Sequence, residues 1–198
     1  MRVLVACEYS GRVRDAFIAQ GHDALSCDLL PTEVPGPHYE GDVRDVIGNG
    51  WDLMIAHPPC TYLCSSGLHW NKRRPERAAQ TEAALEFVKL LMNAPIGRIA
   101  LENPVGCIST RIRKPEQTIQ PYWFGDDASK ATCLWLKNLP LLRPTQMVEG
   151  RFVNGKRRWA NQTDSGQNRL PPSSDRWKQR SETYLGIAAA MAAQWGEL

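Results

Sequence analysis

The sequence predicts one α/β domain over residues 1–198, with a mainly parallel sheet and helices on both faces of that sheet. Short apolar runs alternate with segments whose apolar residues recur at helical spacing, and strands that alternate with helices form parallel sheets. The hydrophobic fraction is 42% and the charged fraction is 23%, which is typical of a globular chain that buries a sizeable core. Apolar runs long enough to cross a membrane, about 18 residues, do not occur in the sequence.

Five apolar runs predict strands, and turn residues separate one run from the next. These runs are residues 2–7, 23–28, 51–57, 98–103 and 132–137. The first run is too short for the apolar core of a secretion signal, so we expect it to be a strand.

Three segments place apolar residues on one face of a helix, and each predicts a helix. They are residues 11–21, which end at the natural helix stop Gly21, residues 75–93, which begin at Pro75, and residues 182–195. The expected core-facing side chains are Val13, Ala16 and Phe17, then Ala84, Phe87, Val88 and Leu91, then Tyr184, Ile187, Ala188, Met191 and Trp195.

Residues 140–180 differ from the rest, because they are polar and rich in turn-forming residues. This composition predicts a loop-rich insertion. Residues 142–180 hold nine lysines and arginines against three acidic residues, although the net charge of the whole chain is only +3. A second basic cluster lies at residues 71–77. Both clusters suit phosphate-containing partners, and both are equally compatible with solvated surface charge.

The six cysteines are spread along the chain, which favours reduced thiols in a cytoplasmic protein. One set of residues, His57, Cys60, Cys64 and His69, offers four possible zinc ligands. Structural zinc sites use two tight pairs of ligands, and this spacing matches that pattern poorly. We therefore expect no metal site.

Polar residues follow several predicted strands at the point where each strand ends. Asp28 ends the second strand, Cys60 follows a Pro-Pro pair after the third, and Glu102 and Asn103 end the fourth. Ligands of open parallel sheets bind at the carboxyl ends of the strands, so these residues are expected to share one edge. Proline has no backbone N–H to donate to a neighbouring strand. The Pro-Pro pair is therefore expected to end the third strand and to place Cys60 just beyond it.

In their order along the chain, these motifs resemble the cytosine-C5 methyltransferase family. The matching stretches are "VLVACEYSGRVRDAF" (3–17), "CDLL" (27–30), "GDV" (41–43), "HPPCTYLCSSG" (57–67), "ENP" (102–104) and "TYLGIAAAMAAQW" (183–195). The resemblance covers residues 1–137 and 181–195. It implies a Rossmann-like fold that uses S-adenosylmethionine to methylate cytosine in DNA.

The resemblance also implies roles for individual residues. Cys60 would add to C6 of cytosine, Glu102 would protonate or hydrogen-bond N3, and Asn103 belongs to the same motif. The cofactor would contact Glu8, Tyr9, Ser10, Gly11, Asp28, Leu29, Asp42, Val43, His57 and Pro58. The substrate or nucleic acid would contact Pro59, Arg111, Arg113, Lys130, Arg157 and Arg158.

The sequence departs from the family pattern at several positions. Val5 stands where the family has an acidic residue, Tyr9 where it has a glycine, and Thr61 where a glutamine is common. A Gln-x-Arg-x-Arg motif is missing from the sequence, and Lys130 is the nearest cation to its usual place. Residues 140–180 are shorter than a domain, so they replace a full target-recognition domain with a short basic insertion.

Three substrate modes follow from this missing domain. The protein methylates duplex DNA with low sequence specificity, or borrows a partner subunit for recognition, or acts on single strands or free cytosine nucleotides, where no base has to be flipped. Two other classes remain open: an amino methyltransferase, which also places Pro-Pro at a strand end, and a non-catalytic module that binds nucleotides or nucleic acid.

Overall fold

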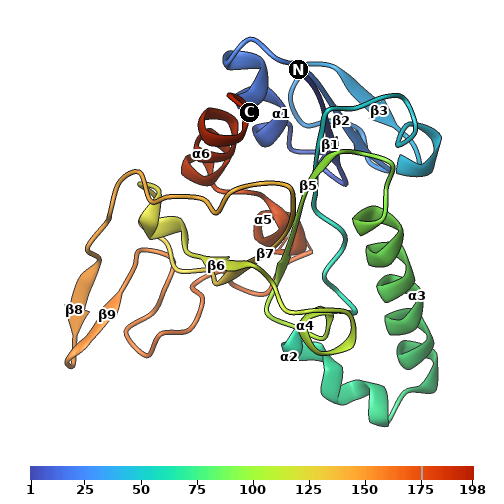
Figure 1. The fold of residues 1–198 in the computed structure, drawn as a ribbon. Coiled ribbons are helices and arrows are strands. Elements are labelled where there is room, and N and C mark those ends of the chain that lie inside the picture. The colour runs from blue at the N-terminus through green and yellow to red at the C-terminus, as the bar shows by residue number, and fades with distance from the viewer. Residues whose placement is uncertain (175) are drawn as a thin grey trace.

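A seven-stranded mixed sheet forms the centre of the computed structural model, which describes residues 1–174 and 176–198 (Figure 1). Its strands, in spatial order, are β3 (His38–Glu40), β2 (Asp23–Asp28), β1 (Arg2–Ala6), β4 (Leu53–Ala56), β5 (Arg98–Pro104), β7 (Thr132–Lys137) and β6 (Gln117–Ile119). The helices are α1 (Arg12–Ala19), α2 (Ser65–Leu68), α3 (Pro75–Met92), α4 (Ile108–Arg111), α5 (Arg176–Ser181) and α6 (Leu185–Trp195). Short 3-10 helices cover Val43–Asp45, His69–Lys72 and Pro121–Trp123.

The first five strands of this order run parallel, and β7 runs antiparallel to both β5 and β6. The central strands β1 and β4 are almost wholly apolar, with Val5 paired to Ile55. Strands with this composition are buried on both faces, as in parallel sheets covered by helices. The prediction of a mainly parallel sheet is therefore confirmed.

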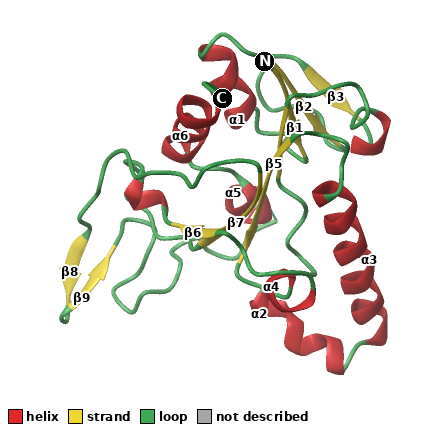
Figure 2. Cartoon of the chain, in the orientation of Figure 1, coloured by secondary structure: helices red, strands yellow, loops and turns green. Residues whose placement is uncertain are grey.

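Helices cover both faces of the sheet, and alternate residues of each strand face opposite layers (Figure 2). Leu4 and Ala6 pack in one cluster with the buried side of α3. Val3 and Val5 pack in the other cluster, with α1 and α6. Because successive side chains of a strand point to opposite faces, two separate cores form above and below one sheet.

The five predicted strands and three predicted helices are present, with shifted ends. The expected strand 51–57 shortens to β4, and the expected helix 182–195 begins only at α6. The core face of α3 is also shifted from the expected one: Leu85, Val88 and Leu91 are buried, whereas Ala84 and Phe87 lie at its margin.

Residues 140–180 contain regular structure that the composition did not predict. β8 (Arg151–Val153) and β9 (Lys156–Arg158) form an antiparallel hairpin, and α5 begins in the same stretch. One residue of this segment, Asp175, lies outside the described residues. The hairpin projects away from the sheet at one side of the molecule (Figure 1).

The hairpin is anchored to the body by the segment around the 3-10 helix Pro121–Trp123. Trp159 stacks on Tyr122 with 4.1 Å between ring centroids. The Asn161 side chain accepts a hydrogen bond from Ser129 N–H at 3.0 Å and donates one to the Ser129 carbonyl at 2.9 Å. The arm therefore has a fixed base, although its tip points outward.

Within the described residues, no helix combines the length and hydropathy that spanning a bilayer requires.

Candidate active site at the carboxyl edge of the sheet

The sheet reverses its strand order between β1 and β4, and the candidate site lies there. From β1 the chain moves to β2 and β3 on one side, and it returns to β4 on the other side. Ligands of open α/β sheets bind in the crevice at such a reversal, beyond the carboxyl ends of the strands. Residues 7–11 after β1 and residues 57–60 after β4 are therefore placed at this edge.

The loop after β4 presents Cys60 at the start of a tight turn. His57 N–H donates to the Ala6 carbonyl at 2.9 Å, which is the last sheet bond before the two prolines. The backbone N–H groups of Leu63 and Cys64 both donate to the Cys60 carbonyl at 3.0 Å. Proline has no backbone N–H, so the hydrogen bonds between strands end here and the Cys60 thiol lies beyond the sheet.

The end of β5 and the segment after it fix this loop from the neighbouring strand. Asn103 Nδ2 donates to the Pro58 carbonyl at 2.7 Å, in a buried position. Cys107 N–H donates to the Leu63 carbonyl at 2.9 Å. A side chain at Gly106 would lie 2.0 Å from that same carbonyl oxygen, so only glycine permits the approach. Asn103 thus positions the Cys60 loop.

Glu102 and His57 form a buried pair beside the thiol. His57 Nδ1 lies 3.3 Å from Glu102 Oε2, and the His57 side chain is only 8% exposed. Burial alone raises the pKa of Glu102, but the hydrogen bond from His57 and the charge of Lys130 outweigh burial and hold that pKa below its usual value. Glu102 is therefore a carboxylate at neutral pH.

Lys130 brings positive charge to the same edge, because β7 runs antiparallel. Thr132, the first residue of β7, pairs with Pro104, the last residue of β5. Lys130 stands just before β7 and its Nζ donates to the Arg180 carbonyl at 2.8 Å. Its charge lowers the pKa of both Glu102 and Cys60. Lys130 is thus the cation shared by the two candidate catalytic groups.

The Cys60 thiol is protonated at neutral pH. Burial raises its pKa, and the proximity of the Cys64 thiol and the negative charge of Glu102 raise that pKa further, against the opposing effect of Lys130. Because the thiolate is the nucleophilic form, reactivity at Cys60 depends on groups that offset this burial.

Two buried polar atoms of the site have no hydrogen-bond partner among the described residues. They are His57 Nε2 and Asn103 Oδ1. Buried polar groups are almost always bonded to protein, water or a ligand. Both belong to the residues that hold the Cys60 loop, so this edge offers a donor or acceptor pair to a bound molecule.

The turn after β1 is occupied by its own structural contacts. The Glu8 carboxylate is buried and accepts from the N–H groups of Val13 at 2.7 Å and Arg14 at 3.2 Å. It also accepts from Ser10 Oγ at 3.2 Å. Glu8 therefore satisfies the free N–H groups that begin α1, a function its sequence position did not reveal. The N-cap residue Gly11 has φ of 72°, where a side chain is disfavoured.

Tyr9 connects this turn to the segment before α6. Its hydroxyl lies 2.8 Å from Ser181 Oγ and donates to the Lys178 carbonyl at 3.2 Å. Its ring packs against Trp177 of α5, with 6.2 Å between centroids. Tyr9 thus holds α5 over the turn.

The ends of β2 and of β3 supply the other expected cofactor residues. Asp28 Oδ1 accepts from Leu30 N–H at 3.0 Å, and burial raises the pKa of this carboxyl. Leu29 beside it is 74% exposed, which leaves an apolar side chain uncovered next to a carboxylate. Asp42 instead begins the 3-10 helix Val43–Asp45 and pairs with Arg44 at 2.7 Å, and Val43 is buried.

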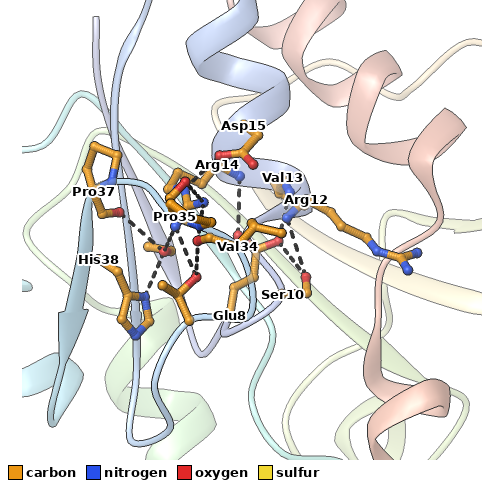
Figure 3. A network of polar contacts seen from close by, with 12 residues as sticks. Glu8, Ser10, Arg12, Val13, Arg14, Asp15, Val34, Pro35, Pro37 and His38 are labelled. Carbon is orange, nitrogen blue, oxygen red and sulfur yellow. Dashed lines mark hydrogen bonds and ion pairs between the residues drawn. The ribbon is translucent and has the colours of Figure 1, made fainter.

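A buried arginine that the sequence analysis did not single out organises the loop between β2 and β3 (Figure 3). Arg14 is fully buried and donates to Ser26 Oγ and Thr32 Oγ1, each at 3.2 Å, and to the Val34 carbonyl at 3.2 Å. Charged residues on a helix are normally exposed, so spacing alone gave no sign of its role. Arg14 holds this loop, which follows Asp28, against α1.

The expected nucleic-acid contacts are dispersed. Pro59 is exposed beside Cys60, and Arg111 pairs with Glu82 of α3 at 2.9 Å. Arg113 donates to the Leu136 carbonyl, near the end of β7 opposite to Lys130, so the structure does not bring it to the site. Two others, Arg157 and Arg158, lie on the projecting hairpin.

The described residues contain no cluster of three or more His, Cys, Asp or Glu side chains that could hold a metal ion. All six cysteines are free thiols, three of them buried: Cys27, Cys107 and Cys133.

Comparison with known proteins gives likenesses of structure but none of sequence. No protein-family model matches the sequence, and no curated protein matches it. Among solved structures, one match is a provisionally assigned DNA modification methyltransferase encoded within a prophage of E. coli. The likeness has a TM-score of 0.49 at 12% sequence identity and covers 75% of this chain. It spans about half of that protein, 52% of its length.

Proposed function

We propose that this protein is a Rossmann-like methyltransferase that uses S-adenosylmethionine to methylate C5 of cytosine in DNA, through a covalent Cys60 adduct. One observation carries the proposal: Cys60 follows β4 at the reversal point of the sheet, Glu102 lies near the carboxyl end of the neighbouring parallel strand β5, and one cation, Lys130, acts on both. A thiol nucleophile and a carboxyl group at one edge are what the covalent mechanism needs.

The residues at the end of β2 fit the proposed cofactor. The Asp28 carboxylate suits the hydroxyls of a ribose, and the uncovered Leu29 side chain suits a flat apolar ring such as adenine. The unpartnered His57 Nε2 and Asn103 Oδ1 add polar atoms at the same edge. When bound, S-adenosylmethionine supplies an electrophilic methyl group.

Cys60 would act as the nucleophile in two opposite steps. Its thiolate forms a bond from Sγ to C6 of cytosine, and the ring electrons then make C5 nucleophilic. After C5 carries the methyl group, loss of the C5 proton restores the double bond and breaks the bond from Sγ to C6. Since the pKa of Cys60 is raised, Lys130 has the task of favouring the thiolate.

Glu102, together with His57, would supply the proton that N3 of cytosine receives. Addition at C6 is favoured when N3 receives a proton, and the free carboxylate of Glu102 holds none at neutral pH. Glu102 must therefore gain a proton as cytosine binds, and His57, which is hydrogen-bonded to it, would deliver one as the imidazolium, passing its Nδ1 proton to the carboxylate and remaining as the neutral imidazole.

Duplex DNA read with low specificity is one substrate mode, with phosphate contacts from the basic insertion that include Arg158. Residues 140–180 are shorter than a domain that could recognise neighbouring bases, so recognition by a partner subunit is the second mode. Pyrimidine C5 modification of single strands or free nucleotides is the third.

Transfer of a labelled methyl group tests the reaction and selects the substrate. Duplex DNA, single-stranded DNA, RNA and cytosine nucleotides are assayed in parallel with wild type, Cys60→Ala and the matched control Cys64→Ala. We expect transfer to one class, a loss of more than about a thousandfold in Cys60→Ala, and activity near wild type in Cys64→Ala. Equal turnover of wild type and Cys60→Ala would refute the covalent mechanism.

A second function, non-catalytic binding of nucleotides or nucleic acid, is favoured by the turn after β1. Glu8 is used to begin α1, and Tyr9 is bonded to Ser181. A binding module would retain its ligand affinity and its biological activity in Cys60→Ala, whereas the methyltransferase would lose activity only.

A further inference from the structure

The segment that follows the Cys60 loop, residues 69–77, is tied directly to that loop. Arg77 Nη2 donates to the Thr61 carbonyl at 2.7 Å, and its Nε donates to the Gly67 carbonyl at 3.2 Å. Asn71 Nδ2 donates to Thr81 Oγ1 at 2.9 Å, and that hydroxyl in turn donates to the Tyr62 carbonyl at 3.0 Å. The segment therefore has a fixed position relative to the nucleophile.

Trp70 is an exposed aromatic side chain of this segment, and its ring packs against that of the neighbouring exposed His69, with 4.8 Å between centroids. The Trp70 side chain is 40% exposed, whereas most large aromatic rings are mainly buried. Arg74 and Arg73 lie over its ring, with their guanidinium carbons 5.1 and 6.0 Å from the centroid. Exposed cation–π contacts of this kind are weak, so the ring remains available to a stronger partner.

The positive charges around Trp70 are not neutralised. Lys72, Arg73 and Arg74 are exposed, and none of them forms an ion pair within the part of the chain that the structure describes. The hairpin differs, because Arg157 pairs there with Glu149, and Arg151 with Asp164 at 2.9 Å. Three adjacent unpaired cations create a local field that attracts phosphate.

We propose that Trp70, Arg73 and Arg74 form a binding site for single-stranded nucleic acid beside Cys60. Trp70 stacks on an unpaired base next to the target, and the two arginines contact the flanking phosphates. An aromatic ring between cations is the usual chemistry for gripping a single strand, since every base has a stacking face. The inference rests on the nucleic-acid substrate in the proposed function and specifies how the strand is held.

The ring argues for a single strand over a duplex. Bases inside a duplex are already stacked on one another and offer no free face to a surface ring. Phosphate contacts alone would need the arginines but not Trp70. The test therefore separates loss of stacking from loss of charge.

Stacking is measured by fluorescence anisotropy with two probes of equal length, an oligodeoxycytidylate and an abasic oligomer that has the same sugar–phosphate backbone. We expect Trp70→Ala to weaken binding of the oligodeoxycytidylate about fivefold or more, and Trp70→Phe to restore most of that affinity. Binding of the abasic oligomer should be unchanged. Leu90→Ala, which removes an exposed apolar side chain from α3, is the control and should leave both affinities unchanged.

Charge is measured from the salt dependence of the same binding. We expect Arg73→Gln and Arg74→Gln each to reduce the slope of log K against log salt by about 0.7, the value for one phosphate contact on a single strand. Lys89→Gln removes an equal charge from an ion pair on α3 and should not change the slope.

Several outcomes would overturn the site. These are no binding of the oligodeoxycytidylate by wild type, wild-type affinity in Trp70→Ala, or an equal loss on the abasic oligomer, which would indicate a folding defect or charge alone. None of these measurements requires methyl transfer. Binding that depends on Trp70 without any transfer would sink the methyltransferase proposal and leave this site standing.

Discussion

Lys130 lowers the pKa of two groups, Cys60 and Glu102, whose proposed roles require opposite protonation states. Its charge favours the thiolate of Cys60, the reactive form, and it also favours the carboxylate of Glu102, which must be protonated to serve N3. One lysine cannot optimise both pKa values. The hydrogen bond between Glu102 and His57 therefore gives the site a separate means of delivering a proton to the carboxylate.

Removing Lys130 should make Cys60 less reactive. The lysine lowers the pKa of the thiol, so Lys130→Met raises that pKa and reduces the thiolate fraction at any pH below it. We expect alkylation of Cys60 by iodoacetamide near neutral pH to slow severalfold, as followed by mass spectrometry of the Cys60 peptide. Lys137→Met, at the other end of β7, is the control and should leave the rate unchanged. An unchanged rate in Lys130→Met would remove the lysine from the site.

At the scale of single elements, the β2–β3 loop depends on one side chain of α1. Arg14 fills the space beneath this loop, and a Cβ at Gly36 would lie 2.6 Å from its guanidinium carbon. The contact is polar: Arg14 donates to Ser26, Thr32 and Val34 (Figure 3). Helix and loop are therefore joined by hydrogen bonds to a buried charge, which are stronger than neutral ones.

Replacing Arg14 by methionine should destabilise the protein by about 2 kcal/mol, because buried acceptors of the loop lose their donor while the volume is kept. The urea midpoint of unfolding measures this loss. Arg44→Met removes an exposed arginine that pairs with Asp42, and it should cost less than about 1 kcal/mol. Equal midpoints in the two variants would mean that the Arg14 network contributes nothing to stability.

The predicted and observed elements differ because sequence periodicity indicates only those elements whose burial requires a repeating apolar pattern. The central strands and long helices were predictable, because their burial imposes apolar runs and stripes. β3 and β6 are three-residue strands with no such pattern, and they form because neighbouring edges supply partners. The hairpin of β8 and β9 turns at Asn154 and Gly155, both with positive φ, within a stretch whose polar composition had predicted only loop.

Within the candidate site, strand ends were predictable and side-chain partners were not. Cys60 and Glu102 follow from the rule that parallel strands end at one edge. The use of Glu8 by α1, and of Tyr9 by α5, depends on contacts between segments far apart in sequence. Local spacing contains no information about such contacts.

At the scale of the whole molecule, the hairpin of β8 and β9 projects away from the sheet as an arm (Figure 1). Its charges are unequally available, because Arg157 pairs with Glu149 whereas Arg158, among the residues that the structure describes, donates only to backbone carbonyls, including that of Asp164 at 3.1 Å. A duplex held by this arm would therefore depend more on Arg158 than on Arg157.

Affinity for duplex DNA at several salt concentrations tests the arm. We expect Arg158→Gln to lower affinity and to flatten the salt slope by about 0.9, the value for one phosphate contact, and Arg157→Gln to do less. Glu149→Gln frees Arg157 and should strengthen binding. If all three variants bind duplex DNA with the salt slope of wild type, the arm is not a phosphate contact.

The position of α6 in the sequence has a consequence for biosynthesis. Its side chains Ile187, Met191 and Trp195 complete the core on the α1 face, yet they leave the ribosome after every strand of the sheet. The opposite face is covered much earlier, by α3. During translation α1 covers only part of that face, so the rest of it stays exposed until α6 is synthesised, and this interval is when the chain most needs chaperone protection.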